Sequence, residues 1–210
     1  LKDFAGYYGV GGIDLSQTID LTAASMVVER DGELYVFCQF FMPEGRVAAG
    51  TEDDGVPYQL MVDQGLLTVS GDHHVNYRDV YDWFVTMVEV HNIRPLKIGY
   101  DRYSAHYLID DLTAYGFHCD DVHQGENLMP VIKEFEGMIR DGHLHIGKNV
   151  LLKAHFLNVA LKHNLELRRF RPVKISSRAR IDGFVSVIDA LTVRQKYYLE
   201  YEYLFSNEGR

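Results

Sequence analysis

The chain has 210 residues, 47% hydrophobic and 24% charged, which fits one α/β domain with an ordinary core and argues against two large domains. A formal net charge of −9 argues against a nucleic-acid-binding surface spread over the whole molecule. Two cysteines outside any CxxC or Cys/His cluster give no sign of a disulfide framework or a zinc site, and no run of about 18 apolar residues offers a membrane span, so we expect a soluble intracellular protein.

The first 42 residues predict a meander of three antiparallel strands, over residues 6–14, 21–29 and 33–42. The Asp31-Gly32 dipeptide between the second and third strands is a strong hairpin signal. Residues 43–56 are rich in Gly, Glu and Asp and lack periodicity, so we expect a loop there, followed by a short helix over 58–64.

Beyond residue 76 helices and strands alternate, a pattern that favours parallel pairing. We expect helices over 77–91, 104–115, 127–140, 148–161 and 180–197, strands over 95–101, 117–122 and 143–146, and a polar hairpin over 164–175. This order predicts an α/β, ribonuclease-H-like fold, in which a mixed central sheet of three antiparallel strands followed by parallel strands is flanked by helices. We expect residues 1–210 to form this single domain, and the missing initiator Met suggests a domain excised from a longer protein.

Three Asp residues stand where this fold would bring them together. Asp14 and Asp101 end the first and fourth expected strands, and Asp182 lies near the start of the last helix. Mg²⁺ and Mn²⁺ prefer such oxygen ligands, and two ions about 4 Å apart can clamp an in-line phosphoryl displacement. Taken singly, each Asp fits a turn or a helix N-terminus equally well, so only the set predicts a catalytic metal site.

Two further acids lie near this set in sequence. Asp20 follows Asp14 by six residues and could reach the same site or serve in a turn. Asp189 follows Asp182 by seven residues, so two helical turns place it on the same helix face, but a surface role is open and we leave it outside the core assignment.

An otherwise acidic chain carries one basic strip. Residues 1–60 hold ten acidic and three basic side chains, whereas residues 162–180 hold seven basic ones and one acidic one. The residues predicted to contact DNA are Arg168, Arg169, Arg171, Lys174, Arg178 and Arg180. Apolar residues interleaved with them suit a hairpin laid along a phosphate backbone, with little sequence preference, although a solvated charged face is the alternative.

Four blocks of the chain, in order, carry a family resemblance: GIDLSQTIDLTA (12–23), PYQLMVDQGLLTVS (57–70), IGYDRYSAHYLIDDL (98–112) and RIDGFVSVIDAL (180–191). Together they resemble the nuclease domain of the large terminase subunit of tailed bacteriophages. In that resemblance Asp14, Asp101 and Asp182 match the family's metal-binding acids, and Asp20 matches an auxiliary acid.

The resemblance implies a Mg²⁺- or Mn²⁺-dependent endodeoxyribonuclease that cuts concatemeric double-stranded viral DNA during genome packaging, in the cytoplasm of the infected bacterial host. It also implies a terminase ATPase domain, a small terminase subunit and a portal as partners. No GxxxxGK[ST] loop occurs in these residues, so the ATPase motor is expected to lie outside this chain.

Two other interpretations remain open. The module could dock DNA or a capsid without cutting. The GIDLSQT segment also looks like the phosphate-binding opening of actin-like sugar kinases, although the chain is short for the two domains that such enzymes need.

Overall fold

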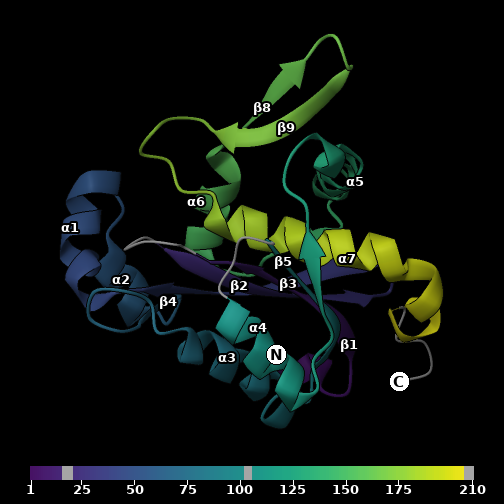
Figure 1. Ribbon diagram of the computed structural model, residues 1–210, viewed down its shortest axis with the longest axis horizontal. Coiled ribbons are helices and arrows are strands. Elements are labelled where there is room, and N and C mark those ends of the chain that lie inside the picture. The colour runs from purple at the N-terminus through teal and green to yellow at the C-terminus, as the bar shows by residue number, and fades with distance from the viewer. Residues whose placement is uncertain (16–20, 102–105, 206–210) are drawn as a thin grey trace.

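The computed structural model describes residues 1–15, 21–101 and 106–205 (Figure 1). The helices and strands are η1 (Lys2–Phe4), β1 (Tyr8–Asp14), β2 (Thr22–Arg30), β3 (Glu33–Met42), α1 (Glu44–Asp54), α2 (Tyr58–Asp63), β4 (Leu67–Val69), α3 (Tyr77–Glu89), β5 (Arg94–Asp101), α4 (His106–Tyr115), β6 (Cys119–Val122), η2 (Glu126–Leu128), α5 (Met129–Arg140), β7 (Leu144–His145), α6 (Val150–Leu157), β8 (Val159–Asn164), β9 (Arg169–Lys174) and α7 (Asp182–Phe205).

Seven of the strands in the described ranges form one mixed sheet in the order β4-β3-β2-β1-β5-β6, with β7 also paired to β3. The pairs β1–β2 and β2–β3 are antiparallel, which confirms the predicted meander. β5 pairs in parallel with β1 on one side and with β6 on the other. The predicted mixed sheet is therefore present, and β8 and β9 form a separate antiparallel hairpin.

Helices cover both faces of this sheet (Figure 1). On one face α5, α6 and α7 pack against it, and on the other lie α3 and α4. Side chains alternate between the faces along each strand: in β2, Val27 joins the core under α7, whereas Met26 and Val28 join the core under α3 and α4. The central strands are thus buried on both sides, as expected for a sheet between two helical layers.

Helix α3 shows how local sequence specifies an element. The side chain of Asn76 accepts a hydrogen bond of 3.1 Å from the Arg78 N–H and so caps the helix. Val80, Phe84 and Met87 follow at intervals of three and four residues and are all buried, so one stripe of the helix packs on the sheet.

Helix α7 lies almost directly on the backbone of the central strands. A Cβ atom added to Gly12 of β1 would stand 1.8 Å from the carbonyl oxygen of Ser186, and one added to Gly99 of β5 would stand 2.4 Å from that of Asp189. The glycines therefore permit a close approach that any side chain would block. Although α7 has 24 residues, no helix in the described part of the chain is long and apolar enough to cross a membrane.

Two predictions about local structure were wrong. Residues 43–56, expected to be a loop, contain α1, which follows Pro43 and ends at Gly55 in the left-handed conformation. The helix expected over residues 148–161 ends at Leu157, and β8 begins at Val159, because these residues pair with β9 instead.

Candidate active site

The ends of β1 and β5 bring two of the predicted acids to one edge of the sheet. The parallel register pairs Ile13 with Tyr100, and Asp14 and Asp101 are the next residue of each strand. Because neighbouring parallel strands end at the same edge, both carboxylates lie in the position expected of a ligand site in an α/β sheet. Both residues are partly buried.

Asp182 approaches the same edge from above the sheet. It is the first residue of α7, which packs on β1 at Gly12, and its side chain is 15% exposed. A carboxylate in a first helical turn is also favoured by the helix dipole.

Electrostatics links these acids to one another. Burial is the largest cause that raises the pKa of Asp14 well above its ordinary value. Three other carboxylates raise the pKa of Asp14 further, in decreasing order Asp182, Asp189 and Asp101. The ammonium group of Lys174, at the end of β9, acts in the opposite direction. Four carboxylates thus share one electrostatic environment, in which the other three disfavour the charge of Asp14.

Asp189 is the fourth member of this group, and it is fully buried. Its Oδ1 accepts a hydrogen bond of 2.7 Å from Nε2 of Gln124, which follows β6, while its Oδ2 is buried without a hydrogen-bond partner among the described residues. Burial raises the pKa of Asp189 well above its ordinary value, the Gln124 hydrogen bond opposes this, and Asp101 adds to it. Asp189 therefore belongs to the site interior and not to the surface.

The carboxylate oxygens of this group are ligands of the kind that a hard divalent cation prefers. Closely placed carboxylates repel one another, and a bound Mg²⁺ or Mn²⁺ would relieve that repulsion. Within the described ranges, however, no three His, Cys, Asp or Glu side chains stand in an arrangement that holds a metal ion as it is. Asp20, the predicted auxiliary acid, lies outside the described residues.

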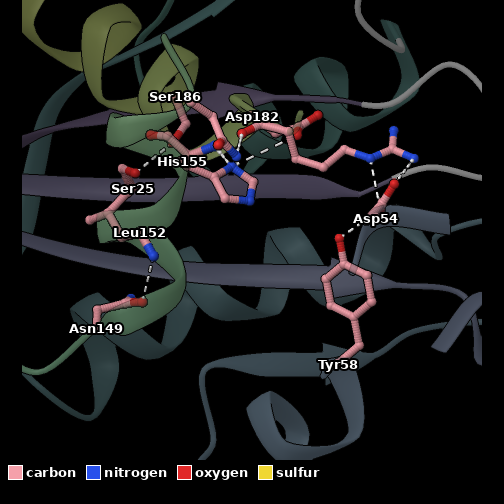
Figure 2. A network of polar contacts seen from close by, with 11 residues as sticks. Ser25, Asp54, Tyr58, Asn149, Leu152, His155, Asp182 and Ser186 are labelled. Carbon is pink, nitrogen blue, oxygen red and sulfur yellow. Dashed lines mark hydrogen bonds and ion pairs between the residues drawn. The ribbon is translucent and has the colours of Figure 1, made fainter. Parts of the chain in front are cut away.

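A buried histidine lies against the start of α7 (Figure 2). His155 of α6 is 2% exposed, and its Nδ1 accepts a hydrogen bond of 3.0 Å from the Gly183 N–H. The same Nδ1 is 3.8 Å from Oδ2 of Asp182. Burial, followed by the charges of Arg180 and Lys174, lowers the pKa of His155 to about 3, so the ring is neutral near pH 7 and this contact is not an ion pair.

An ion pair lies on the other side of Asp182. Nε and Nη2 of Arg180 bind the two carboxylate oxygens of Asp54 at 2.9 and 3.1 Å, and the Tyr58 hydroxyl donates to Oδ2 of Asp54 at 2.8 Å (Figure 2). Such two-pronged pairing fixes orientation as well as charge. Arg180 thus differs from the rest of the predicted DNA-binding strip, because its guanidinium faces a carboxylate of α1.

The other basic residues of the strip are exposed. The β8–β9 hairpin projects from the layer of α5, α6 and α7 (Figure 1). Its exposed cations, together with one in the segment before α7, are Arg168, Arg169, Arg171, Lys174 and Arg178. Their positions suit contact with a polyanion, and their part in DNA binding stays a prediction.

Three residues of this arrangement escaped the sequence analysis: Asp54, Gln124 and His155. Asp54 stands in a segment expected to be a loop, and nothing in the sequence around Gln124 marks it. A signal was available for His155, since it is the one imidazole in the apolar run VLLKAHFL (150–157), where a buried polar group needs a partner.

Comparisons with known proteins agree with this architecture. The family profile of the terminase large subunit endonuclease domain matches residues 1–196. The large terminase subunit of Enterobacteria phage HK97 is 25% identical over 180 residues, which are 84% of this chain and 35% of that protein. The crystal structure of the HK97 large terminase has a TM-score of 0.75 at 22% identity, over 91% of this chain and 42% of that one.

A second solved structure is the large terminase nuclease of the thermophilic phage G20c, crystallised with bound magnesium. Its TM-score is 0.56 at 11% identity, over 90% of this chain and 84% of that one. At this identity the likeness concerns the fold, and it confirms the predicted ribonuclease-H-like arrangement. Since the family profile covers nearly the whole length, the chain belongs to the terminase large subunit endonuclease domains, a family of metal-dependent nucleases.

Proposed function

We propose that this domain is a Mg²⁺- or Mn²⁺-dependent endonuclease that cuts double-stranded DNA with little sequence preference, and that Asp14, Asp101 and Asp182 bind its metal ions. The observation that carries the proposal is geometric: Asp14 and Asp101 end neighbouring parallel strands, and Asp182 begins the helix that packs on β1 at Gly12. The magnesium bound by the G20c nuclease supports the choice of cation. We propose Asp20 as an auxiliary acid.

In this proposal the three carboxylates hold two cations, and the hairpin holds the DNA. Bound divalent ions supply activation of water and neutralisation of the charge that develops on the leaving 3′ oxygen. Asp14 and Asp101 contribute from the rigid ends of two neighbouring strands, so their separation is set by the sheet. The exposed cations of the strip bind the phosphate backbone without reading bases.

The setting of the reaction is proposed from the family. We infer that the substrate is concatemeric viral DNA in the infected bacterial cytoplasm, and that the partners are the terminase ATPase domain, the small terminase subunit and the portal. The chain spans 35% of the length of the curated HK97 relative, so a motor domain elsewhere in the full protein fits this inference.

Cleavage of supercoiled plasmid tests the proposal. We expect nicking and linearisation with Mg²⁺ or Mn²⁺ and none with EDTA, and we expect Asp14→Ala, Asp101→Ala and Asp182→Ala each to lower the rate at least about a hundredfold. Asp63→Ala, which removes an exposed carboxylate on α2, is the matched control and should cut at the wild-type rate. Unchanged cleavage in any two of the three site variants would sink the assignment.

A DNA-docking module is the second candidate. It is favoured by the exposed basic hairpin and by the absence, within the described ranges, of three ligands already arranged around a metal position. Salt-sensitive DNA binding by a folded protein that never cuts in Mn²⁺, even when joined to its motor domain, would support this reading against the nuclease.

A further inference from the structure

At the N-terminus of α7 the first N–H groups lack acceptors within the helix. Two hydrogen bonds that hold this end of α7 involve one neighbouring segment, the C-terminal end of α6. The Gly183 N–H donates to Nδ1 of His155 at 3.0 Å, and the carbonyl oxygen of Arg180 accepts from Nδ2 of Asn158 at 3.0 Å. The two bonds lie on either side of Asp182 in the sequence.

His155 and Asn158 are three residues apart, so both face the same side of α6. The His155 ring is buried against Phe40 of β3, with ring centroids 4.7 Å apart, and cannot turn away without opening the core. Its Nδ1 accepts a hydrogen bond, which places the ring proton on Nε2. The main chain on both sides of Asp182 is therefore held by an element that belongs to the rigid interior.

The chemistry of His155 also suits the neighbouring carboxylate. A first-turn carboxylate is a common acceptor for a helix N–H, but at the Gly183 N–H the acceptor is the imidazole of His155. Nδ1 of His155 and Oδ2 of Asp182 are 3.8 Å apart. Because Nδ1 accepts a hydrogen bond and carries no proton, it donates none to this carboxylate oxygen.

The ion pair between Arg180 and Asp54 is a further contact at the start of α7. Arg180 is two residues before Asp182, and Asp54 ends α1, so the segment entering α7 is fixed to a second element. The side chain of Asp54 is 3% exposed, which shields this pair from solvent.

We propose that His155 and Asn158 are positioning residues that orient Asp182 for metal binding by holding the main chain on its two sides. This inference rests on the proposed function, because it takes Asp182 as a metal ligand. Groups outside the ligand set that orient a metal ligand typically matter 10- to 100-fold for affinity, so removing either main-chain contact should be measurable.

The test is Mn²⁺ binding measured by isothermal titration calorimetry, without DNA. His155→Phe keeps a ring but removes the acceptor, and we expect it to weaken Mn²⁺ binding by about 10- to 100-fold. His155→Asn places an amide oxygen near the position of Nδ1 and should recover most of the affinity. Asn158→Ala, at a partly exposed position, keeps the proposal testable if the Phe variant does not fold, and we expect a loss of about tenfold.

Two controls separate positioning from mere stability and from the proposed function itself. Leu151→Ala cuts a buried side chain of the same helix, and we expect it to lower the melting temperature and keep the Mn²⁺ affinity. Equal weakening in Leu151→Ala would overturn the inference, as would wild-type affinity in both His155→Phe and Asn158→Ala while Asp182→Asn binds weakly. If Asp182→Asn itself binds Mn²⁺ like the wild type, the assignment of Asp182 fails and the inference fails with it.

Discussion

At the scale of single residues, Asp189 shows the conflict between stability and the proposed chemistry. A carboxyl group with no exposed surface and one oxygen lacking a hydrogen-bond partner in the described ranges is costly to ionise. Its neighbours Asp14 and Asp101 add negative charge to the same interior. Such an arrangement is typical of a functional site and not of a core selected for stability.

The raised pKa of Asp189 predicts how stability depends on pH. The folded protein holds this proton at pH values where the unfolded chain has lost it, so stability falls as pH rises above the ordinary Asp value of 3.8 toward the raised folded pKa. Asp189→Asn removes the titration and keeps an oxygen for Gln124. In EDTA, melting temperatures between pH 5 and 8 should therefore fall less steeply for this variant than for the wild type.

Asp63→Asn, at an exposed position, is the control for this pH series and should follow the wild-type curve. Parallel wild-type and Asp189→Asn curves would show that the Asp189 carboxyl ionises equally easily in the folded and unfolded chains, against the pKa direction given above.

At the scale of elements, α7 and its contact with the sheet decide where Asp182 lies. Gly12 allows the helix backbone to meet the β1 backbone, and a Cβ there would stand 1.8 Å from Ser186 O and 2.7 Å from Ala190 N. Both are main-chain atoms, which cannot turn aside as a flexible side chain can. The helix as a whole would have to move.

We therefore expect Gly12→Ala to destabilise the domain by roughly 1–3 kcal/mol or more, through overpacking, and to reduce metal-dependent cleavage as Asp182 moves with the helix. Gly137→Ala is the matched control, because this α5 glycine has nothing within 4 Å of an added Cβ. It should stabilise by up to about 1 kcal/mol through helix propensity. Thermal unfolding of both variants checks the pair, and an unchanged melting temperature in Gly12→Ala would contradict the close packing.

Residues 43–56, expected to be a loop, contain α1, which forms against a weak local signal. Three glycines and four acidic residues in the region 44–55 weaken the local helical signal. The helix forms because tertiary contacts select it: Val47 is buried in the core, Gly50 lies against the Tyr58 ring, and Asp54 pairs with Arg180. Such contacts have no periodic trace in the sequence.

At the scale of the whole molecule, charge is divided between an acidic body and the basic hairpin. Arg169 and Arg171 alternate with buried Phe170 in β9, so both arginines point to the exposed side of the hairpin. This separation gives a chain of net charge −9 a locally basic surface, which the proposed contact with DNA phosphates requires.

We expect Arg169→Ala and Arg171→Ala each to weaken DNA binding and to reduce the slope of log K against log salt concentration by about 1, as for a lost phosphate contact. Arg78→Ala, on α3 at the opposite face of the sheet, is the control and should keep the wild-type slope. Fluorescence anisotropy with labelled duplexes of unrelated sequence measures the effect. An unchanged slope in both hairpin variants would show that DNA does not contact this surface.

Periodicity and turn residues, which act over a few neighbours, predicted the three-strand meander, most of the later helices and strands, the strand-end positions of Asp14 and Asp101, and the helix-start position of Asp182. The surroundings of Asp182 could not be predicted from such local signals. The bonds from His155 to Gly183 and from Asn158 to the Arg180 carbonyl join residues 28 and 22 positions apart, and the pair of Asp54 and Arg180 spans 126. Contacts of that range depend on how α1, α6 and α7 pack together, and the same packing encloses Asp189 beside Gln124, where the sequence had left a surface role open.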